Sequence, residues 1–119
     1  MTIFETTLTE ANVKQEPGRH HIYITPFRDQ LPKDVFGGPS QHDKPRCLVR
    51  LEFGALRTDT FVPSYQNGKP RTFFQDRWFV GEFFSRTDAQ PGEMVLFEQI
   101  SLYHYRLAMR KLDGTVVTA

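Results

Sequence analysis

A chain of 119 residues is about the size of one domain, and its 39% hydrophobic content with eleven phenylalanines suffices for one aromatic-rich core. The net charge of +1 excludes a strongly basic protein, so a nucleic-acid surface would have to gather its positive charge on one face. One cysteine excludes an internal disulfide, and its place in an apolar run predicts a reduced core residue. With no long apolar run and no secretion signal, we expect a soluble, cytoplasmic protein.

The N-terminal third predicts short elements. Residues 1–18 are expected to form a loose arm or a helical turn over 10–14, capped by Thr7 or Thr9 and ended by Pro17-Gly18. The run 20–25 is rich in β-branched and aromatic residues and predicts a strand. Pro32, which suits the start of a helix, and Gly37-Gly38, which suit its end, predict one or two helical turns between them.

The rest of the chain predicts four strands and a helix. Residues 46–53 alternate apolar and polar side chains, which indicates a half-buried strand, paired antiparallel with 56–62. Acidic and basic ends favour a helix over 76–86, with Trp78 packed in the core. Residues 94–101 and 103–111 predict two more strands, and 112–119 a tail. These elements predict a mostly antiparallel, barrel-like sheet with two small helices.

Catalytic and metal-binding patterns are not evident in the sequence. The carboxylates are scattered, and none forms the cluster with a nearby lysine that a metal-dependent nuclease needs. The histidines lack metal-site spacing with Cys47, although His42 lies in a polar loop where it could contact a ligand. We therefore expect no cofactor, no metal and no enzymatic activity of the chain's own.

Two polar loops, residues 28–44 and 64–72, share the same chemistry. Each combines basic side chains, which bind phosphates, with amides that can read base edges. Both loops are equally compatible with ordinary surface turns, and Asn67-Gly68 is a common hairpin turn. Composition alone therefore leaves DNA contact open.

The stretch GKPRTFFQDRWFVGEFFSRTDAQPGEMVLFE (68–98) resembles the DNA-binding pseudobarrel family. This family includes the B-three domain of plant transcription factors and the effector-binding domain of EcoRII-type restriction endonucleases. Its pattern is a basic loop, a short strand, a helix with an early aromatic residue, a turn of Pro or Ala, Gly and Asp, and an apolar strand. Glu93 replaces the commoner aspartate of the turn. The resemblance extends over about residues 19–111.

The resemblance implies an open, seven-stranded pseudobarrel, largely antiparallel, with two short helices. This domain would span 19–111, flanked by the N-terminal segment 1–18 and a tail or linker, 112–119. Two arms would grip the major groove of double-stranded DNA, and their positions match the two polar loops. The implied function is sequence-specific recognition in a restriction-modification system, beside a nuclease or methyltransferase domain. The alternative is a protein-interaction or regulatory module without nucleic-acid binding, which the near-neutral charge favours.

Each loop residue then receives an expected role. The residues expected to read bases are Arg71, Asn67, Gln66 and Tyr65 on one arm and Arg28, Gln30 and His42 on the other. The residues expected to bind phosphate are Lys33, Lys44, Lys69 and Ser64.

Overall fold

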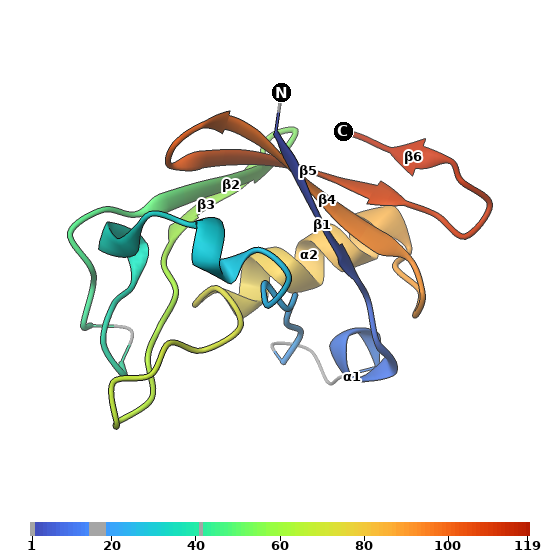
Figure 1. The fold of residues 1–119 in the computed structure, drawn as a ribbon. Coiled ribbons are helices and arrows are strands. Elements are labelled where there is room, and N and C mark those ends of the chain that lie inside the picture. Colours follow the sequence, from blue (N-terminus) through green and yellow to red (C-terminus); the bar gives the residue numbers. More distant parts are fainter. Residues whose placement is uncertain (1, 15–18, 41) are drawn as a thin grey trace.

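The computed structural model describes residues 2–14, 19–40 and 42–119, which form an open, mixed β-sheet with one long helix lying against it (Figure 1). The strands are β1 (Ile3–Thr7), β2 (Val49–Phe53), β3 (Leu56–Thr60), β4 (Met94–Ser101), β5 (His104–Arg110) and β6 (Val116–Val117). The helices are α1 (Glu10–Val13) and α2 (Arg77–Thr87), with 3-10 turns η1 (Arg28–Gln30) and η2 (Lys33–Val35).

The strands follow the order β1-β4-β5-β2-β3, and β6 also pairs with β5. Neighbouring strands are antiparallel except β2 and β5, which are parallel. The alternation predicted for β2 is confirmed, because Val49, Leu51 and Phe53 are buried while Arg50 is exposed. Its antiparallel pairing with β3 is also confirmed. One face of the sheet therefore supplies the core and the other carries charged side chains.

Helix α2 covers the apolar face of the sheet (Figure 1). Its N-cap is Asp76, whose carboxylate accepts a hydrogen bond from the Phe79 amide at 2.8 Å. Phe79 and Phe83 are fully buried, and the Phe83 ring meets Phe53 of β2 edge to face at 5.1 Å. The helix predicted over 76–86 is thus confirmed within one residue at each end.

The prediction that Trp78 packs in the core is wrong, because 63% of this residue is exposed. The buried stripe of α2 begins one residue later, at Phe79. A neighbouring residue lies about 100° around a helix, so Trp78 points away from the stripe. The aromatic character of the segment is real, but this ring belongs to the outer surface.

Seven strands were expected, and the described residues form six. The run 20–25 contributes no regular strand; its Ile24 amide donates instead to the Thr72 carbonyl at 2.7 Å, in a loop. Conversely, residues at both ends of the chain pair with the sheet, as β1 with β4 and β6 with β5. Thr9 caps α1 as predicted, whereas Pro17-Gly18 lies outside the described residues.

The described helices were compared with the length and apolar character of a membrane-spanning helix. Throughout residues 2–14, 19–40 and 42–119, no helix has both the length and the apolar character that a bilayer span requires.

Candidate nucleic-acid interface

The two polar segments, residues 28–46 and 64–72, lie against each other and form one continuous face, called here the loop surface. Backbone contacts join them: Phe36 and Val62 form a parallel bridge, and the Gly37 amide donates to the Val62 carbonyl at 2.8 Å. Ser64 completes the junction, because its hydroxyl donates to the Gly37 carbonyl at 2.8 Å and its amide to Gly38 at 3.1 Å. The loops are therefore fixed relative to each other.

Arg28 makes a second connection across the junction. Its Nη1 lies 3.3 Å from the Pro70 carbonyl and 3.4 Å from the Arg71 carbonyl, as a donor to both. Between the loops lies a groove of about 610 Å³. Its lining comprises Arg28, Asp29, Leu31, Lys33, Phe36 and Pro70. The groove is thus lined by both apolar and charged side chains.

The segment 64–72 is a small hairpin that projects at the lower left of Figure 1. The Tyr65 amide donates a hydrogen bond to the Lys69 carbonyl at 2.8 Å, and the Gly68 amide donates one to the Tyr65 carbonyl at 2.9 Å. Gly68 has a φ of 86°, a left-handed conformation that favours glycine. The turn predicted from Asn67-Gly68 is confirmed, and it exposes all residues from Tyr65 to Pro70.

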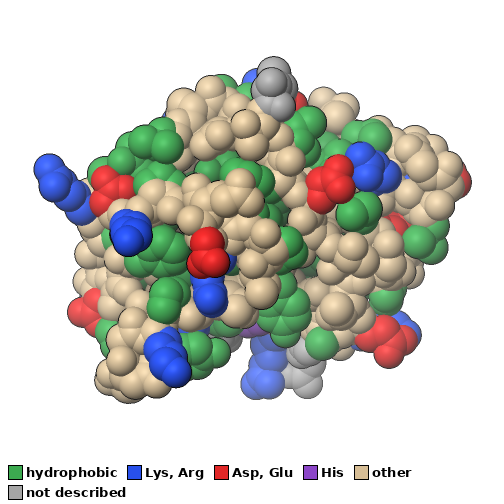
Figure 2. Space-filling model, viewed as in Figure 1, with side chains coloured by type: hydrophobic (Ala, Val, Ile, Leu, Met, Phe, Trp, Pro, Cys, Tyr) green, Lys and Arg blue, Asp and Glu red, His purple; other side chains and the backbone are tan. Residues whose placement is uncertain are grey.

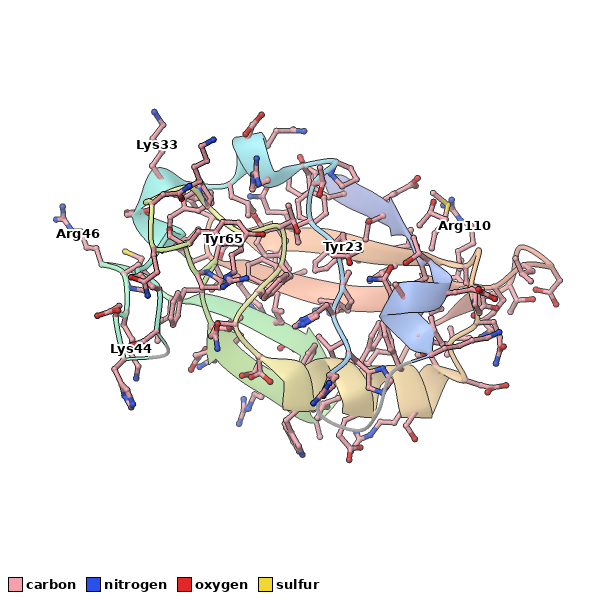
Figure 3. The ribbon with its side chains drawn as sticks, turned by 90° about the horizontal axis from the view of Figure 1, so that it is seen from below. Tyr23, Lys33, Lys44, Arg46, Tyr65 and Arg110 are labelled. Carbon is pink, nitrogen blue, oxygen red and sulfur yellow. The ribbon has the colours of Figure 1, made fainter. Side chains whose placement is uncertain are left out.

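Positive charge on the loop surface is not balanced locally. Six of the 15 Lys and Arg residues lie on it with three of the 14 acidic residues, so it carries a formal +3 and the remaining chain −2. The six are Arg28, Lys33, Lys44, Arg46, Lys69 and Arg71. Figure 2 shows Lys and Arg side chains gathered over this part of the molecule, and Figure 3 shows Lys33, Lys44 and Arg46 pointing outward.

The pairing of cations differs between the loop surface and the remaining fold. Within the described part of the chain, none of the six loop cations forms an ion pair. Cations elsewhere in the fold that do form ion pairs include Lys14, Arg50, Arg86, Arg106, Arg110 and Lys111. The loop surface therefore offers a net positive charge whose cations are not held in ion pairs, which is an arrangement that attracts a polyanion.

Arg71 lies in a stack of rings. Its guanidinium carbon is 4.3 Å from the centre of the Tyr65 ring and 5.8 Å from that of Phe73. The Phe73 ring in turn stacks on His21 at 4.0 Å. A guanidinium over an aromatic face is an attractive arrangement, worth about 0.5–1 kcal/mol at an exposed position. The stack holds a charged side chain in one place on the surface.

The sequence-predicted residues occupy different positions on the loop surface. Those that are exposed are Gln30, Lys33, His42, Lys44, Tyr65, Gln66, Asn67 and Lys69. Arg28 and Arg71 are half-buried by the contacts given above. Ser64, expected to bind phosphate, is buried and holds the two loops together instead.

Sequence reasoning missed one exposed cation. Arg46 was assigned to the following strand, but regular pairing begins only at Val49, so Arg46 extends the positive face beside Lys44. The preceding proline was the available signal, since the residues around a proline favour loops and strand edges.

Asp34 anchors the first loop to the sheet. It accepts hydrogen bonds from the Tyr103 hydroxyl at 2.7 Å and from the Cys47 thiol at 3.5 Å. The Tyr103 bond is the main cause of a lowered pKa for Asp34, and the same bond raises the pKa of Tyr103. Cys47 is half-buried at this anchor, so the prediction of a core cysteine is wrong.

The described residues contain no group of three His, Cys, Asp or Glu side chains that could hold a metal ion. Comparisons of the chain with protein-family models, with curated proteins and with solved structures found no match.

Proposed function

We propose that this chain binds double-stranded DNA sequence-specifically through the loop surface, as the recognition module of a restriction-modification system. One observation carries the proposal. Two loops joined by a hydrogen bond between residues 27 apart in sequence meet in one face, and the Lys and Arg residues of that face form no ion pair within the described residues. Phosphate contacts made by such cations would position the duplex, and base edges would then be read in the groove.

The finer fold assignment, an open pseudobarrel, belongs to the same proposal. The largely antiparallel sheet, the helix α2 and the placement of the two loops support it. The contacts between the loops also refine the mechanism. Arms that close from opposite sides would need independent movement, whereas Ser64 and Arg28 join these loops. The loop surface would therefore enter one groove as a single unit.

Within this unit, the exposed lysines would contact phosphates. The exposed amides of Gln30, Gln66 and Asn67 would face bases, together with Arg28, Arg71 and His42. Cleavage or methylation would be carried out by a nuclease or methyltransferase partner, and the system would act in the cytoplasm.

The salt dependence of duplex binding tests the proposal. The triple variant Lys33→Ala, Lys44→Ala and Lys69→Ala removes three exposed loop cations. If each contacts one phosphate, the slope of log affinity against log salt falls by about 0.9 per contact, so by about 2.7 in total. Fluorescence anisotropy with a random 20-base-pair duplex at several salt concentrations measures this slope.

A matched control removes three exposed cations elsewhere, with Lys14→Ala, Arg57→Ala and Arg86→Ala, and should leave the slope unchanged. If the slope fell equally in both triple variants, the DNA contacts would not be confined to the loop surface. Absence of salt-dependent binding by the unmodified protein would refute DNA binding altogether.

A protein-interaction module is the second candidate, and the exposed Trp78 favours it. Tryptophan is enriched among the residues that dominate protein interfaces, and this one has most of its surface in solvent. Retention of a protein partner that Trp78→Ala releases, without any affinity for duplex DNA, would support this candidate over the first.

A further inference from the structure

The stack around Arg71 gives the loop surface a specific chemistry, on the premise that the surface binds DNA as proposed. Two separate parts of the chain build it, residues 65–73 and the segment that contains His21. Tyr65 and Arg71 lie on opposite sides of the hairpin, which is closed by the Ser64–Pro70 bridge. Phe73 follows Arg71 by two residues, and His21 reaches the stack from the extended segment that pairs with Thr72.

Backbone hydrogen bonds fix the members of the stack. The Tyr65 amide donates to Lys69 at 2.8 Å, and the Arg71 amide donates to the Pro63 carbonyl at 2.8 Å. The side chains of Tyr65 and Arg71 therefore start from a rigid hairpin. The conformational entropy of the long Arg71 side chain is lost on folding instead of on binding, which favours affinity for a ligand.

The stack leaves the donors of the Arg71 guanidinium unused. The guanidinium carbon lies over the Tyr65 ring, 4.3 Å from its centre, and 5.8 Å from the centre of the Phe73 ring. The N–H groups of a guanidinium form a planar fork of donors, and an aromatic ring offers them no lone pair. In the part of the chain that the structure describes, no group accepts a hydrogen bond from the Arg71 side chain, although its backbone carbonyl is used by Arg28.

A planar fork of free donors matches two acceptors in one plane. In the major groove, guanine presents the acceptors O6 and N7 in this way, and a phosphate offers a similar pair of oxygens. A lysine would not substitute, because its ammonium has no planar fork. We propose that the loop surface reads a guanine through Arg71, and that Tyr65 and Phe73 are positioning residues for this contact. Tyr65 thus acts through Arg71 and not by touching a base.

Base substitution in a bound duplex tests the contact. The probe is a duplex selected by the protein from a random pool, compared with the same duplex carrying 7-deazaguanine, which lacks N7, at each guanine in turn. At one guanine, the unmodified protein should lose at least about fivefold in affinity. A phosphate contact would give no such loss at any guanine, which would overturn the proposal.

Variants of Tyr65 test the positioning role. Tyr65→Leu removes the ring and should reduce the 7-deazaguanine effect to within about twofold. Tyr65→Phe keeps the ring and should retain the effect. Tyr23→Leu is the matched control, because Tyr23 is also an exposed tyrosine on this side of the molecule but lies outside the stack (Figure 3).

The outcomes separate the two proposals. If Tyr65→Leu binds the selected duplexes and shows the same 7-deazaguanine effect as the unmodified protein, the inference about Tyr65 and Arg71 is overturned while the proposed DNA binding stands. The inference is also overturned if Tyr65→Phe reduces the 7-deazaguanine effect as much as Tyr65→Leu does. The Tyr65 hydroxyl, and not its ring, would then be the group on which the guanine contact depends. Failure to bind any duplex refutes the proposed function and the inference with it.

A measurement without DNA checks the stack itself. Ring currents should shift the Arg71 Nε–Hε resonance upfield in the NMR spectrum of the unmodified protein and of Tyr65→Phe. In Tyr65→Leu this resonance should move back toward the position of a free arginine. An unchanged resonance in Tyr65→Leu would mean that Tyr65 does not hold Arg71, and the inference would fail.

Discussion

Trp78 and Phe83 lie on the same helix and have opposite surroundings. Trp78 is 63% exposed, whereas Phe83 is fully buried and packs on Phe53, Phe79 and Phe84. Their difference follows from angular position on α2, since both are large and aromatic. The stability of the fold should therefore depend on one and not on the other.

Trp78→Ala should change the free energy of unfolding by no more than about 0.5 kcal/mol, as is usual for a surface substitution. Phe83→Ala should cost about 3–5 kcal/mol, because it removes a buried ring and leaves a cavity. Urea denaturation of both variants measures these changes. A cost for Trp78→Ala close to that of Phe83→Ala would show that the indole is packed against the fold in solution.

At the scale of elements, single side chains attach the loops to the sheet. Asp34 of η2 accepts a hydrogen bond from Tyr103, in the turn that leads into β5, and pairs through its backbone carbonyl with the Cys47 amide at 3.0 Å. The first loop is thereby tied at η2 and again just before β2. The ionisation of Asp34 consequently affects how firmly this loop is held.

The stability that Tyr103 contributes should depend on pH at both extremes. Because the folded pKa of Asp34 is lowered, its contribution is complete above the unfolded value of about 4 and is lost as the pH falls through the folded pKa. Because the pKa of Tyr103 is raised, its contribution is complete below about pH 10 and is lost as the pH rises through the folded pKa.

Urea midpoints of the unmodified protein and of Tyr103→Phe between pH 2 and 11 measure this dependence. The difference between the two proteins should be constant from about pH 5 to 9 and smaller outside that window. A difference that persisted unchanged at the lowest pH would mean that the hydrogen bond does not discriminate between the two forms of Asp34.

At the scale of the whole molecule, the junction between the loops decides whether they act together. Ser64 is buried there, and its hydroxyl and amide both bond to the glycine pair of the first loop. These bonds link segments separated by 27 residues in sequence. Loss of the hydroxyl should loosen the junction without disturbing the sheet.

Ser64→Ala should lower the free energy of unfolding by about 1 kcal/mol, the usual net value of one hydrogen bond. It should also speed amide hydrogen exchange at Gly37 and at Ser64's position more than in β4 or β5, because the opening is local. Ser85→Ala, on the exposed side of α2, is the control and should change neither quantity. Uniform acceleration over the whole sheet would contradict a local role.

The sequence alone determined the features that depend on local chemistry. The alternation in 49–53, the acidic cap of α2 and the Asn67-Gly68 turn each need only neighbouring residues, and each was predicted correctly. The chemistry of the two polar loops was also readable, since residue types fix which groups can donate and accept.

Tertiary structure decided what depends on distant partners. Residues 20–25 have strand-like composition but pair with a loop, and the N-terminal segment gains a strand because β4 offers a free edge. Ser64 joins the loops, and His21 stacks on Phe73 beside Arg71, only because the fold brings separate segments together. Backbone pairing and side-chain stacking between distant segments are set by packing, and no local pattern encodes them.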